Sequence, residues 1–198
     1  EYTEKQLMYF ERAVKKAKEI LDEIKYIHCN ASNGILNFVE NSYNLVRPGI
    51  IMYGYEPFEG AKEKIDLKPV CKLKSKITFL KEVEEGASIG YSRSYITKRK
   101  TKVATIPIGY ADGFKRELSN KGYVLINGKK APIIGSICMD GFMADVTDIE
   151  ASIGDEVYIW DNENITLEEV ASMAGTMNYE MMSTIMHRVP RIFINREN

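Results

Sequence analysis

The sequence predicts an α+β protein in which a mostly antiparallel β domain follows the last units of an α/β domain. Residues 1–62 alternate helical and strand patterns, in the order helix, strand, helix, strand. Residues 63–198 contain mainly short β-rich runs separated by turns. We therefore expect two domains with a boundary after residue 62. Because so few α/β units cannot complete a parallel architecture, the first domain is expected to be the end of a larger one.

The first element is expected to be an amphipathic helix over residues 2–24. Its apolar residues recur at helical intervals: Leu7, Phe10, Val14, Ala17, Leu21 and Ile24. Thr3 and Gln6 have the spacing of a capping box, which predicts that the helix begins there.

Three further elements are predicted in the first domain. Residues 25–32, "KYIHCNAS", are typical of a short strand that ends in small polar residues. Residues 34–41, "GILNFVEN", favour a short helix, and residues 43–54, "YNLVRPGIIMYG", a second apolar strand. In such α/β units ligand groups gather at the carboxyl ends of the strands.

The second domain is predicted from β-rich runs at residues 76–83, 102–110, 123–139 and 155–161. Inside the third run, Asn127-Gly128 supplies the positive φ angles of a hairpin turn. Nearer the end of the chain, Thr166 and Glu169 form a capping box for a short helix that Gly175 ends. Another short helix and a final strand over residues 188–194 are expected to follow.

The composition fits a globular protein with a buried core. Lys plus Arg total 27 and Asp plus Glu 28, a formal net charge of −1, so no overall field attracts nucleic acid or a membrane. No apolar run approaches the roughly 20 residues that span a bilayer, and the start resembles no signal peptide. We expect a small-molecule substrate or protein partners, no nucleic acid, and no membrane segment in this chain.

The cysteines and the first residue bear on location and completeness. Cys29, Cys71 and Cys138 are an odd number without metal-ligand spacing, so we expect buried thiols in a reducing compartment, the cytoplasm, and no metal site. The chain starts at Glu1 without an initiating Met, which suggests a processed or excised piece of a longer protein.

Two candidate sites lie in the first domain. In "HCNAS", residues 28–32, Ser32 stands at a helix start, where free N–H groups suit a phosphate, although a simple capping role is the alternative. In "VRPGIIMYG", Arg47 lies in a predicted buried strand and therefore needs a partner, for which a salt bridge is the simplest explanation. Gly49 and Ile50 offer backbone N–H groups beside it.

Two more candidates lie in the second domain. In "PIGYADG", two glycines and an alanine surround Tyr110, which allows the backbone to approach a ligand closely, although an ordinary turn has the same pattern. "ICMDG", residues 137–141, has the pattern of a strand end with an exposed Asp. Neither motif is decisive by its spacing.

Taken together, six ordered motifs resemble the second half of the pyridoxal-phosphate-dependent alanine racemase family. The resemblance covers about residues 28–193, and several motifs in one order are far more specific than any one of them. The motifs are "HCNAS", "NLVRPGIIMYG", "GYS", "TIPIGYADGFKR", "PIIGSICMD" and "HRVPRIF".

The resemblance implies the architecture and the cofactor. In this family a TIM-type barrel holds pyridoxal 5′-phosphate (PLP), and a β-rich tail domain follows it. Two subunits pair head to tail, so that each tail completes its partner's active site. Residues 1–62 are thereby identified as the final part of the PLP-binding barrel. Residues 63–198 are identified as the C-terminal β-barrel domain of a homodimer that interconverts L- and D-alanine for peptidoglycan.

The resemblance also implies a catalytic residue. Tyr91 matches the family's catalytic tyrosine, which exchanges the α-proton on one face of the substrate while a lysine serves the other face. Two acid–base groups on opposite faces of a planar carbanion invert the centre without moving the substrate. A phenol is a weak base, so a neighbouring cation is expected to favour its ionised form.

The other matches fall on substrate and cofactor positions. Tyr110 and Arg116 match entrance residues, and the backbone of Met139, beside Asp140, matches the contact to the substrate carboxylate. Arg47 matches the arginine that faces the pyridine nitrogen of PLP; because Arg holds its proton tightly, the ring is a weaker electron sink, which limits transamination. Ser32, Gly49 and Ile50 match positions that bind the phosphate, and His28 matches the residue that supports the arginine.

The chain departs from the commonest family pattern in three places. His187 stands where many members have a tyrosine that contacts the phosphate and narrows the site. Ala31 replaces an Asn before the phosphate serine, and Ser136 occupies a position where some members have an entrance arginine. A change at His187 favours relaxed selectivity, so a serine or broad-specificity racemase of the vancomycin-resistance type is the main alternative.

The family's cofactor lysine belongs to a motif that precedes these 198 residues, and no lysine here matches it. The chain alone is therefore expected to bind no PLP covalently and to be inactive without the rest of the barrel. Two other function classes remain. A PLP decarboxylase of related architecture uses a Cys motif that Cys138 in "ICMD" does not match, and a non-catalytic dimerisation module needs no Tyr91 chemistry.

Overall fold

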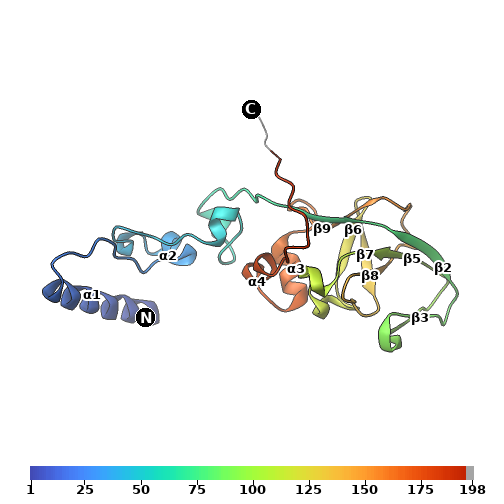
Figure 1. Cartoon of the computed structure of the whole chain (residues 1–198), viewed down its shortest axis with the longest axis horizontal. Helices are drawn as coiled ribbons and strands as arrows, with labels where there is room; N and C mark the ends of the chain where they lie inside the picture. Colours follow the sequence, from blue (N-terminus) through green and yellow to red (C-terminus); the bar gives the residue numbers. More distant parts are fainter. Residues whose placement is uncertain (195–198) are drawn as a thin grey trace. The chain divides into compact units, whose positions relative to one another are not determined.

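The computed structural model describes residues 1–194, and the chain divides into two compact units (Figure 1). The first unit is Glu1–Val70, and the second begins at Cys71. In the described part of the chain, no helix is long and apolar enough to cross a membrane.

The first unit contains helices and loops. The long helix α1 (Tyr2–Ile20) buries none of its side chains within this unit. The shorter helices are α2 (Ser32–Asn37), η1 (Val39–Asn41), η2 (Ile50–Tyr53) and η3 (Ala61–Glu63).

The start and end of α1 differ from the prediction. The N-cap residue is Glu1, and no side-chain capping bond forms, so the expected Thr3–Gln6 capping box is wrong. The helix ends at Ile20, one turn earlier than predicted, and Leu21 is extended. It ends before Asp22, a residue type whose side chain competes for helical backbone hydrogen bonds.

The two strands predicted in the first unit are wrong. Residues 25–32 and 43–54 share only one parallel bridge, between Ala31 and Arg47. The Arg47 N–H donates to the Asn30 carbonyl at 2.9 Å, and Pro48 then removes the next donor. Apolar composition alone does not make a strand, because a strand needs a neighbour along its length. Arg47 is therefore exposed rather than buried in a strand.

The second unit is an antiparallel β domain, as predicted. Seven strands form one sheet in the order β1-β9-β6-β7-β8-β5-β2, and a separate hairpin pairs β3 with β4. Every strand pair is antiparallel. The strands are β1 (Leu73–Lys76), β2 (Phe79–Val83), β3 (Ser88–Ile89), β4 (Tyr95–Ile96), β5 (Thr101–Ile106), β6 (Tyr123–Ile126), β7 (Lys129–Ile134), β8 (Phe142–Asp145) and β9 (Glu156–Trp160).

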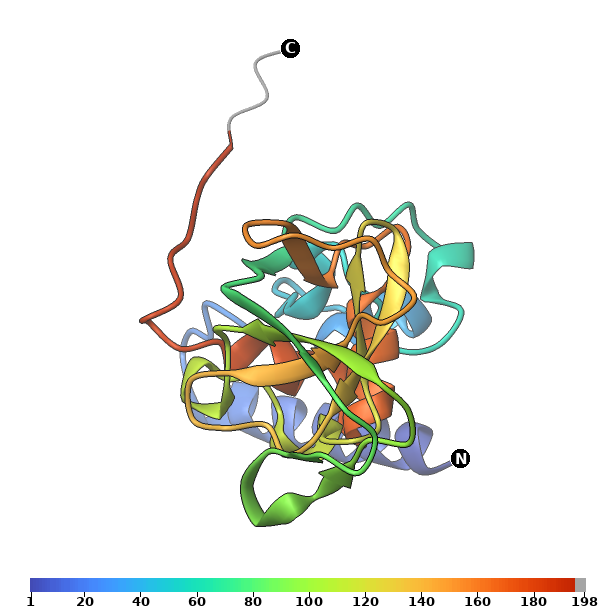
Figure 2. The same cartoon turned by 90° about the vertical axis from the view of Figure 1, so that its right-hand side faces the viewer.

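The sheet closes into a barrel because the nearly continuous stretch β1–β2 changes its hydrogen-bonding partner strand from β9 to β5. The outermost strands of the order, β1 and β2, follow each other in the chain and are separated only by Ile77 and Thr78. The Ile77 N–H donates to the backbone carbonyl of Asp155, just before β9, and the Thr78 N–H donates to the backbone carbonyl of Thr105 in β5. The curled sheet seen in Figure 2 is thus a barrel-like circuit, with the β3–β4 hairpin projecting from it.

The core of the barrel consists of the inward side chains of these strands. Ile106, Ile126, Phe142 and Ile159 are fully buried, and Phe142 packs on Phe114 with ring centroids 5.1 Å apart. The predicted Asn127-Gly128 turn joins β6 to β7, with φ of 50° and 74° at these two residues. The hairpin prediction is confirmed.

Helix α3 (Leu167–Ala174) contacts strand β9 of the barrel, and α4 (Asn178–Ser183) packs against α3. The Thr166 hydroxyl accepts the Glu169 N–H, and Gly175 ends α3 in the left-handed conformation, as predicted. The Glu169 carboxylate instead accepts the Tyr123 hydroxyl and pairs with Lys130. Half of the expected capping box is therefore present.

The predicted final strand over residues 188–194 is wrong. The Arg191 guanidinium donates to three carbonyls of its own segment, those of Ile185, Met186 and Val189, at 2.7 to 2.8 Å. These bonds fold the segment into a turn, so it does not extend along the sheet. Ile192, Phe193 and Ile194 are exposed.

The loop after β9 provides a test of acid stability. Asp161 is buried; burial alone would raise its pKa, but bonds from the Asn164 side chain and from the N–H groups of Ile165, Glu163 and Asn164 lower it to about 2. Since the ordinary value is 3.8, Asp161 stabilises the fold above pH 4, and this contribution is lost as the pH falls towards 2.

We expect Asp161→Asn to lower the free energy of unfolding by about 2 kcal/mol at pH 7 and to have little effect near pH 2. The amide keeps one acceptor oxygen but turns an N–H₂ group towards Asn164. Trp160, the only tryptophan, is buried beside the loop and reports urea unfolding by fluorescence. An equal destabilisation at both pH values would contradict the assignment.

Candidate active site

The Tyr91 loop joins β3 to β4 and exposes its phenol. Tyr91 begins the short helix η4 (Tyr91–Arg93) and is 73% exposed. Ser92 and Arg93 have φ of 59° and 52°, although neither is glycine. Such conformations cost about 1–3 kcal/mol each and persist where the surroundings enforce them.

The surroundings of this loop come from two neighbouring segments. The Ser94 and Ser136 hydroxyls are 2.8 Å apart. The Asn120 side chain donates to the Ser94 carbonyl at 3.1 Å and accepts the Gly135 N–H at 2.6 Å. At Gly90, with φ of 75°, a Cβ atom would lie 2.9 Å from the Ser136 nitrogen. These contacts hold the Tyr91 loop against residues 135–136.

The loop that begins at Tyr110, called the Tyr110 loop, lies against residues 138–139, which follow residues 135–136 along the chain. Tyr110 begins η5 (Tyr110–Asp112), and its N–H donates to the Cys138 carbonyl at 3.1 Å. The Ala111 N–H donates to the Met139 carbonyl at 2.9 Å. A Cβ atom at Gly109 would lie 2.3 Å from the Cys138 carbonyl oxygen. This glycine therefore permits close approach of the loop to the backbone of residues 138–139, whereas the predicted approach to a ligand stays a prediction.

Residues 135–140 thus connect the two tyrosine loops. Arg116, in η6 (Arg116–Leu118), and Asp140 are both exposed, and their charges influence the pKa of the Cys138 thiol. Burial raises the pKa of that thiol, the Asp140 charge raises it further, and the Arg116 charge opposes both. Within residues 1–194 the Met139 N–H has no hydrogen-bond acceptor. It is a donor available to a carboxylate.

The two residues that flank His187 bind the Tyr110 loop. The Met186 N–H donates to the Asp112 carbonyl at 3.0 Å, and the Arg188 Nε pairs with the Asp112 carboxylate at 2.7 Å. A Cβ atom at Gly113, with φ of 98°, would lie 2.1 Å from the Thr184 carbonyl oxygen. The exposed His187 is therefore carried by a segment fastened to the Tyr110 loop.

The predicted cofactor-binding residues other than His187 lie in the first unit. Ser32 is 2% exposed, and its hydroxyl accepts the Gly49 N–H at 2.8 Å. The N-cap of α2 is Ala31, without a side-chain bond, so Ser32 does not cap the helix. Ile50, next to Gly49, is buried at the start of η2.

Arg47 is hydrogen-bonded to Cys29 and Asn30, the two residues that follow His28. The Arg47 guanidinium donates to the Cys29 carbonyl at 3.2 Å, so its described partner is a backbone oxygen rather than a carboxylate. Burial raises the pKa of the Cys29 thiol, which the Arg47 charge opposes. The His28 Nδ1 atom is buried and has no partner among the described residues. Cys29, Cys71 and Cys138 are half-buried rather than fully buried, and no disulfide joins them in the described part of the chain.

Sequence patterns missed three supporting residues. Asn120, Asp112 and Arg188 make the bonds that hold the tyrosine loops, yet none is part of a catalytic pattern. The "YADG" and "HRVPR" motifs contain Asp112 and Arg188, but only their contact shows why. No group of three or more His, Cys, Asp or Glu able to hold a metal occurs within the described residues.

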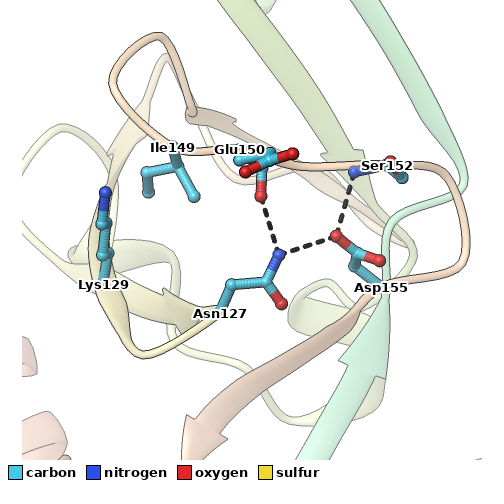
Figure 3. A pocket seen from close by; sticks show the side chains of 6 residues that line it. All are labelled: Asn127, Lys129, Ile149, Glu150, Ser152 and Asp155. Carbon is cyan, nitrogen blue, oxygen red and sulfur yellow. Dashed lines mark hydrogen bonds between the residues drawn. The ribbon is translucent and has the colours of Figure 1, made fainter.

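A hollow of about 390 Å³ lies elsewhere on the β domain, and its polar groups bind one another (Figure 3). The Asn127 amide donates to the Glu150 carbonyl and to the Asp155 carboxylate, both at 2.8 Å. The Ser152 N–H donates to the same carboxylate at 2.9 Å. These bonds fasten the β6–β7 turn to the loop before β9, which is a structural role.

Two family models match this chain, one in each unit. The family model described as "Alanine racemase, C-terminal domain" matches residues 70–193, and "Alanine racemase, N-terminal domain" matches residues 1–57. A curated relative, alanine racemase of Halothermothrix orenii, is 42% identical over an alignment 199 residues long that covers 98% of this chain and 52% of the relative. The chain spans about half the length of the curated relatives it matches.

Solved structures give the same result. Alanine racemase from Bacillus anthracis with bound L-Ala-P has a TM-score of 0.91 at 38% identity and covers 98% of this chain, which spans 51% of that one. Alanine racemase from Bartonella henselae with covalently bound pyridoxal phosphate has a TM-score of 0.86 at 35% identity, with coverages of 98% and 52%. Together the two family models match more than half of the described residues. This chain belongs to the alanine racemase family.

Proposed function

We propose that this chain is the C-terminal part of a PLP-dependent alanine racemase, with residues 1–62 from its barrel and residues 63–198 as its β domain. The observation that carries the proposal is the exposed Tyr91 phenol on a strained, hydrogen-bonded loop. Strain of this kind is typical of sites where a group must be held in one geometry.

In this proposal Tyr91 moves the proton on one face of the substrate. When bound, PLP withdraws electrons from the substrate α-carbon and so acidifies its C–H bond. The Tyr91 hydroxyl oxygen accepts or returns that proton, and the Met139 N–H binds the substrate carboxylate. Tyr110 and Arg116 line the entrance, with Asp140 beside them. A phenol held on one face adds the proton only from that side, which inversion requires.

The first unit has groups that suit the cofactor. The Ser32 hydroxyl accepts the Gly49 N–H, so its own proton is free to donate to a phosphate oxygen. Gly49 thus orients Ser32, and Ile50 begins the adjoining helix. The Arg47 guanidinium would face the pyridine nitrogen; it donates to the carbonyl of Cys29, the residue next to His28, whose Nδ1 has no partner among the described residues. These donors fit an anionic phosphate and a neutral ring nitrogen.

The proposal extends to assembly and location. Exposed catalytic groups on one unit fit a homodimer in which each β domain completes the partner's site, head to tail. We further propose that none of the lysines in this chain is the covalent PLP lysine. Cysteines that form no disulfide among the described residues are typical of a reducing cytoplasm, where the product D-alanine would serve peptidoglycan synthesis.

The experiment is racemisation of L-alanine and L-serine by the full-length protein with PLP, with the 198-residue chain alone as the control. We expect the full-length protein to prefer alanine by at least about 10-fold in kcat/KM, since one hydroxyl changes the fit in the pocket. The chain alone should show no turnover and no absorption band of covalently bound PLP.

Each other outcome assigns a different function. An equal or faster rate on serine would replace alanine as the substrate and make His187 the first residue to exchange. Release of carbon dioxide would indicate a decarboxylase. Covalent PLP on the isolated chain would place the cofactor lysine within these residues.

A further inference from the structure

The carboxylate of Asp112 connects the segments that carry two of the proposed site residues, Tyr110 and His187. It lies in the Tyr110 loop, is 6% exposed, and uses both of its oxygens. One oxygen accepts the Gly109 N–H at 2.8 Å, and the other pairs with the Arg188 Nε at 2.7 Å. The first bond closes the turn that presents Tyr110, and the second fixes the segment that presents His187.

The backbone around Asp112 extends these connections. Its carbonyl accepts the Met186 N–H at 3.0 Å, and the adjacent Ala111 N–H donates to Met139 at 2.9 Å. Tyr110, Met139 and His187 therefore lie on three segments that meet at Asp112 and the neighbouring Ala111, and the buried carboxylate joins two of these segments directly. The Tyr91 loop is held by other groups, Asn120 and Ser136.

We propose that the Asp112–Arg188 ion pair is a positioning device that sets the substrate-binding side of the site, separately from the group that moves the proton. The inference rests on the proposed racemase function. Asp112 and Arg188 act through Tyr110, Met139 and His187, without touching the substrate. Because the Asp112 carboxylate is buried, solvent competes less for this pair than for an ion pair with both partners exposed, even though the Arg188 side chain is 55% exposed.

The separation predicts a kinetic signature. Loosening the pair displaces Tyr110 and the Met139 backbone, which bind the substrate, but leaves the Tyr91 loop in place. A displaced binding group weakens ground state and transition state alike, so KM rises and kcat changes little. A purely structural ion pair would instead lower the melting temperature and leave KM of the folded enzyme unchanged.

The experiment measures kcat and KM for L-alanine with the PLP-loaded full-length enzyme, well below its melting temperature. The variants are Asp112→Asn, Arg188→Gln, their double variant and Arg188→Lys. Arg99→Gln is the matched control, because Arg99 forms an exposed bidentate pair with Asp148. Arg188 is 55% exposed, so Arg188→Gln should fold even if Asp112→Asn does not.

We expect Arg188→Gln to raise KM by on the order of 10-fold with kcat within about 3-fold of the parent. The double variant should be no worse than Asp112→Asn, since both changes break one unit. Arg188→Lys should restore most of the loss by keeping the charge, and Arg99→Gln should leave both constants unchanged.

Three results would overturn the inference. The first is a KM within 2-fold of the parent for Arg188→Gln, with turnover intact. The second is a double variant whose loss is the product of the two single losses. The third is an equal rise in KM for Arg99→Gln. If the parent enzyme does not racemise alanine at all, the proposed function fails and the inference fails with it.

Discussion

Tyr91→Phe in the full-length protein should lower kcat for alanine racemisation by on the order of 10³-fold, because it removes the only atom of this side chain that can exchange a proton. Folding should be unaffected, since the side chain is 73% exposed and the aromatic ring is retained. The dimer should persist as well. The measurements are racemisation kinetics, thermal melting and the mass of the assembly in solution.

Tyr2→Phe is the matched control, because Tyr2 is 74% exposed and lies in the helix α1 of the other unit. It should leave all three measurements unchanged. Intact turnover in Tyr91→Phe would remove the catalytic role and favour a β domain that serves only dimerisation. Loss of both dimer and turnover would make Tyr91 an interface residue.

Gly109→Ala should destabilise the β domain by about 3 kcal/mol and abolish most activity. Its Cβ atom would lie 2.3 Å from the Cys138 carbonyl oxygen and 2.5 Å from the Met139 carbonyl carbon. These are backbone atoms, so relief requires the Tyr110 loop to separate from residues 138–139. The Tyr110 and Ala111 hydrogen bonds to that segment would be lost with it. Urea unfolding of the 198-residue chain, followed by Trp160 fluorescence, measures the change.

Gly128→Ala separates this effect from backbone strain. Gly128 has φ of 74° and open space around a Cβ atom, whereas Gly109, with φ of −140°, is crowded but unstrained. The control should cost about 1 kcal/mol, from the left-handed conformation alone, and leave kcat unchanged. A Gly109→Ala variant no less stable than Gly128→Ala would mean that the loop moves away without cost.

The β domain was predictable because its signals are local. The β-rich runs, the Asn127-Gly128 turn and the Thr166 cap each specify structure within a few residues, and strands, turn and cap are all present. The first unit was less predictable. The stretches 25–32 and 43–54 are apolar like strands, but a strand exists only where a neighbour pairs along it, and here the pairing is one bridge.

Local motifs likewise predicted one part of the candidate site and failed to predict another. The motifs around Tyr91 and Tyr110 identified the loops, and the structure places both against residues 135–140. The roles assigned to these tyrosines stay predictions. Arg47 was expected in a buried strand, and its exposed guanidinium instead binds a carbonyl of its own unit.

By itself, the sequence determined the family, the β-rich second unit and the residue types available for acid–base and anion-binding chemistry. Those properties depend on side-chain identity and on short-range backbone preferences, which a linear pattern contains. Only the tertiary structure decided which groups support the site. Asp112 meets Arg188, and Asn120 meets Ser94, across many intervening residues. Such contacts depend on how closed strands bring distant loops together, and no local preference encodes them.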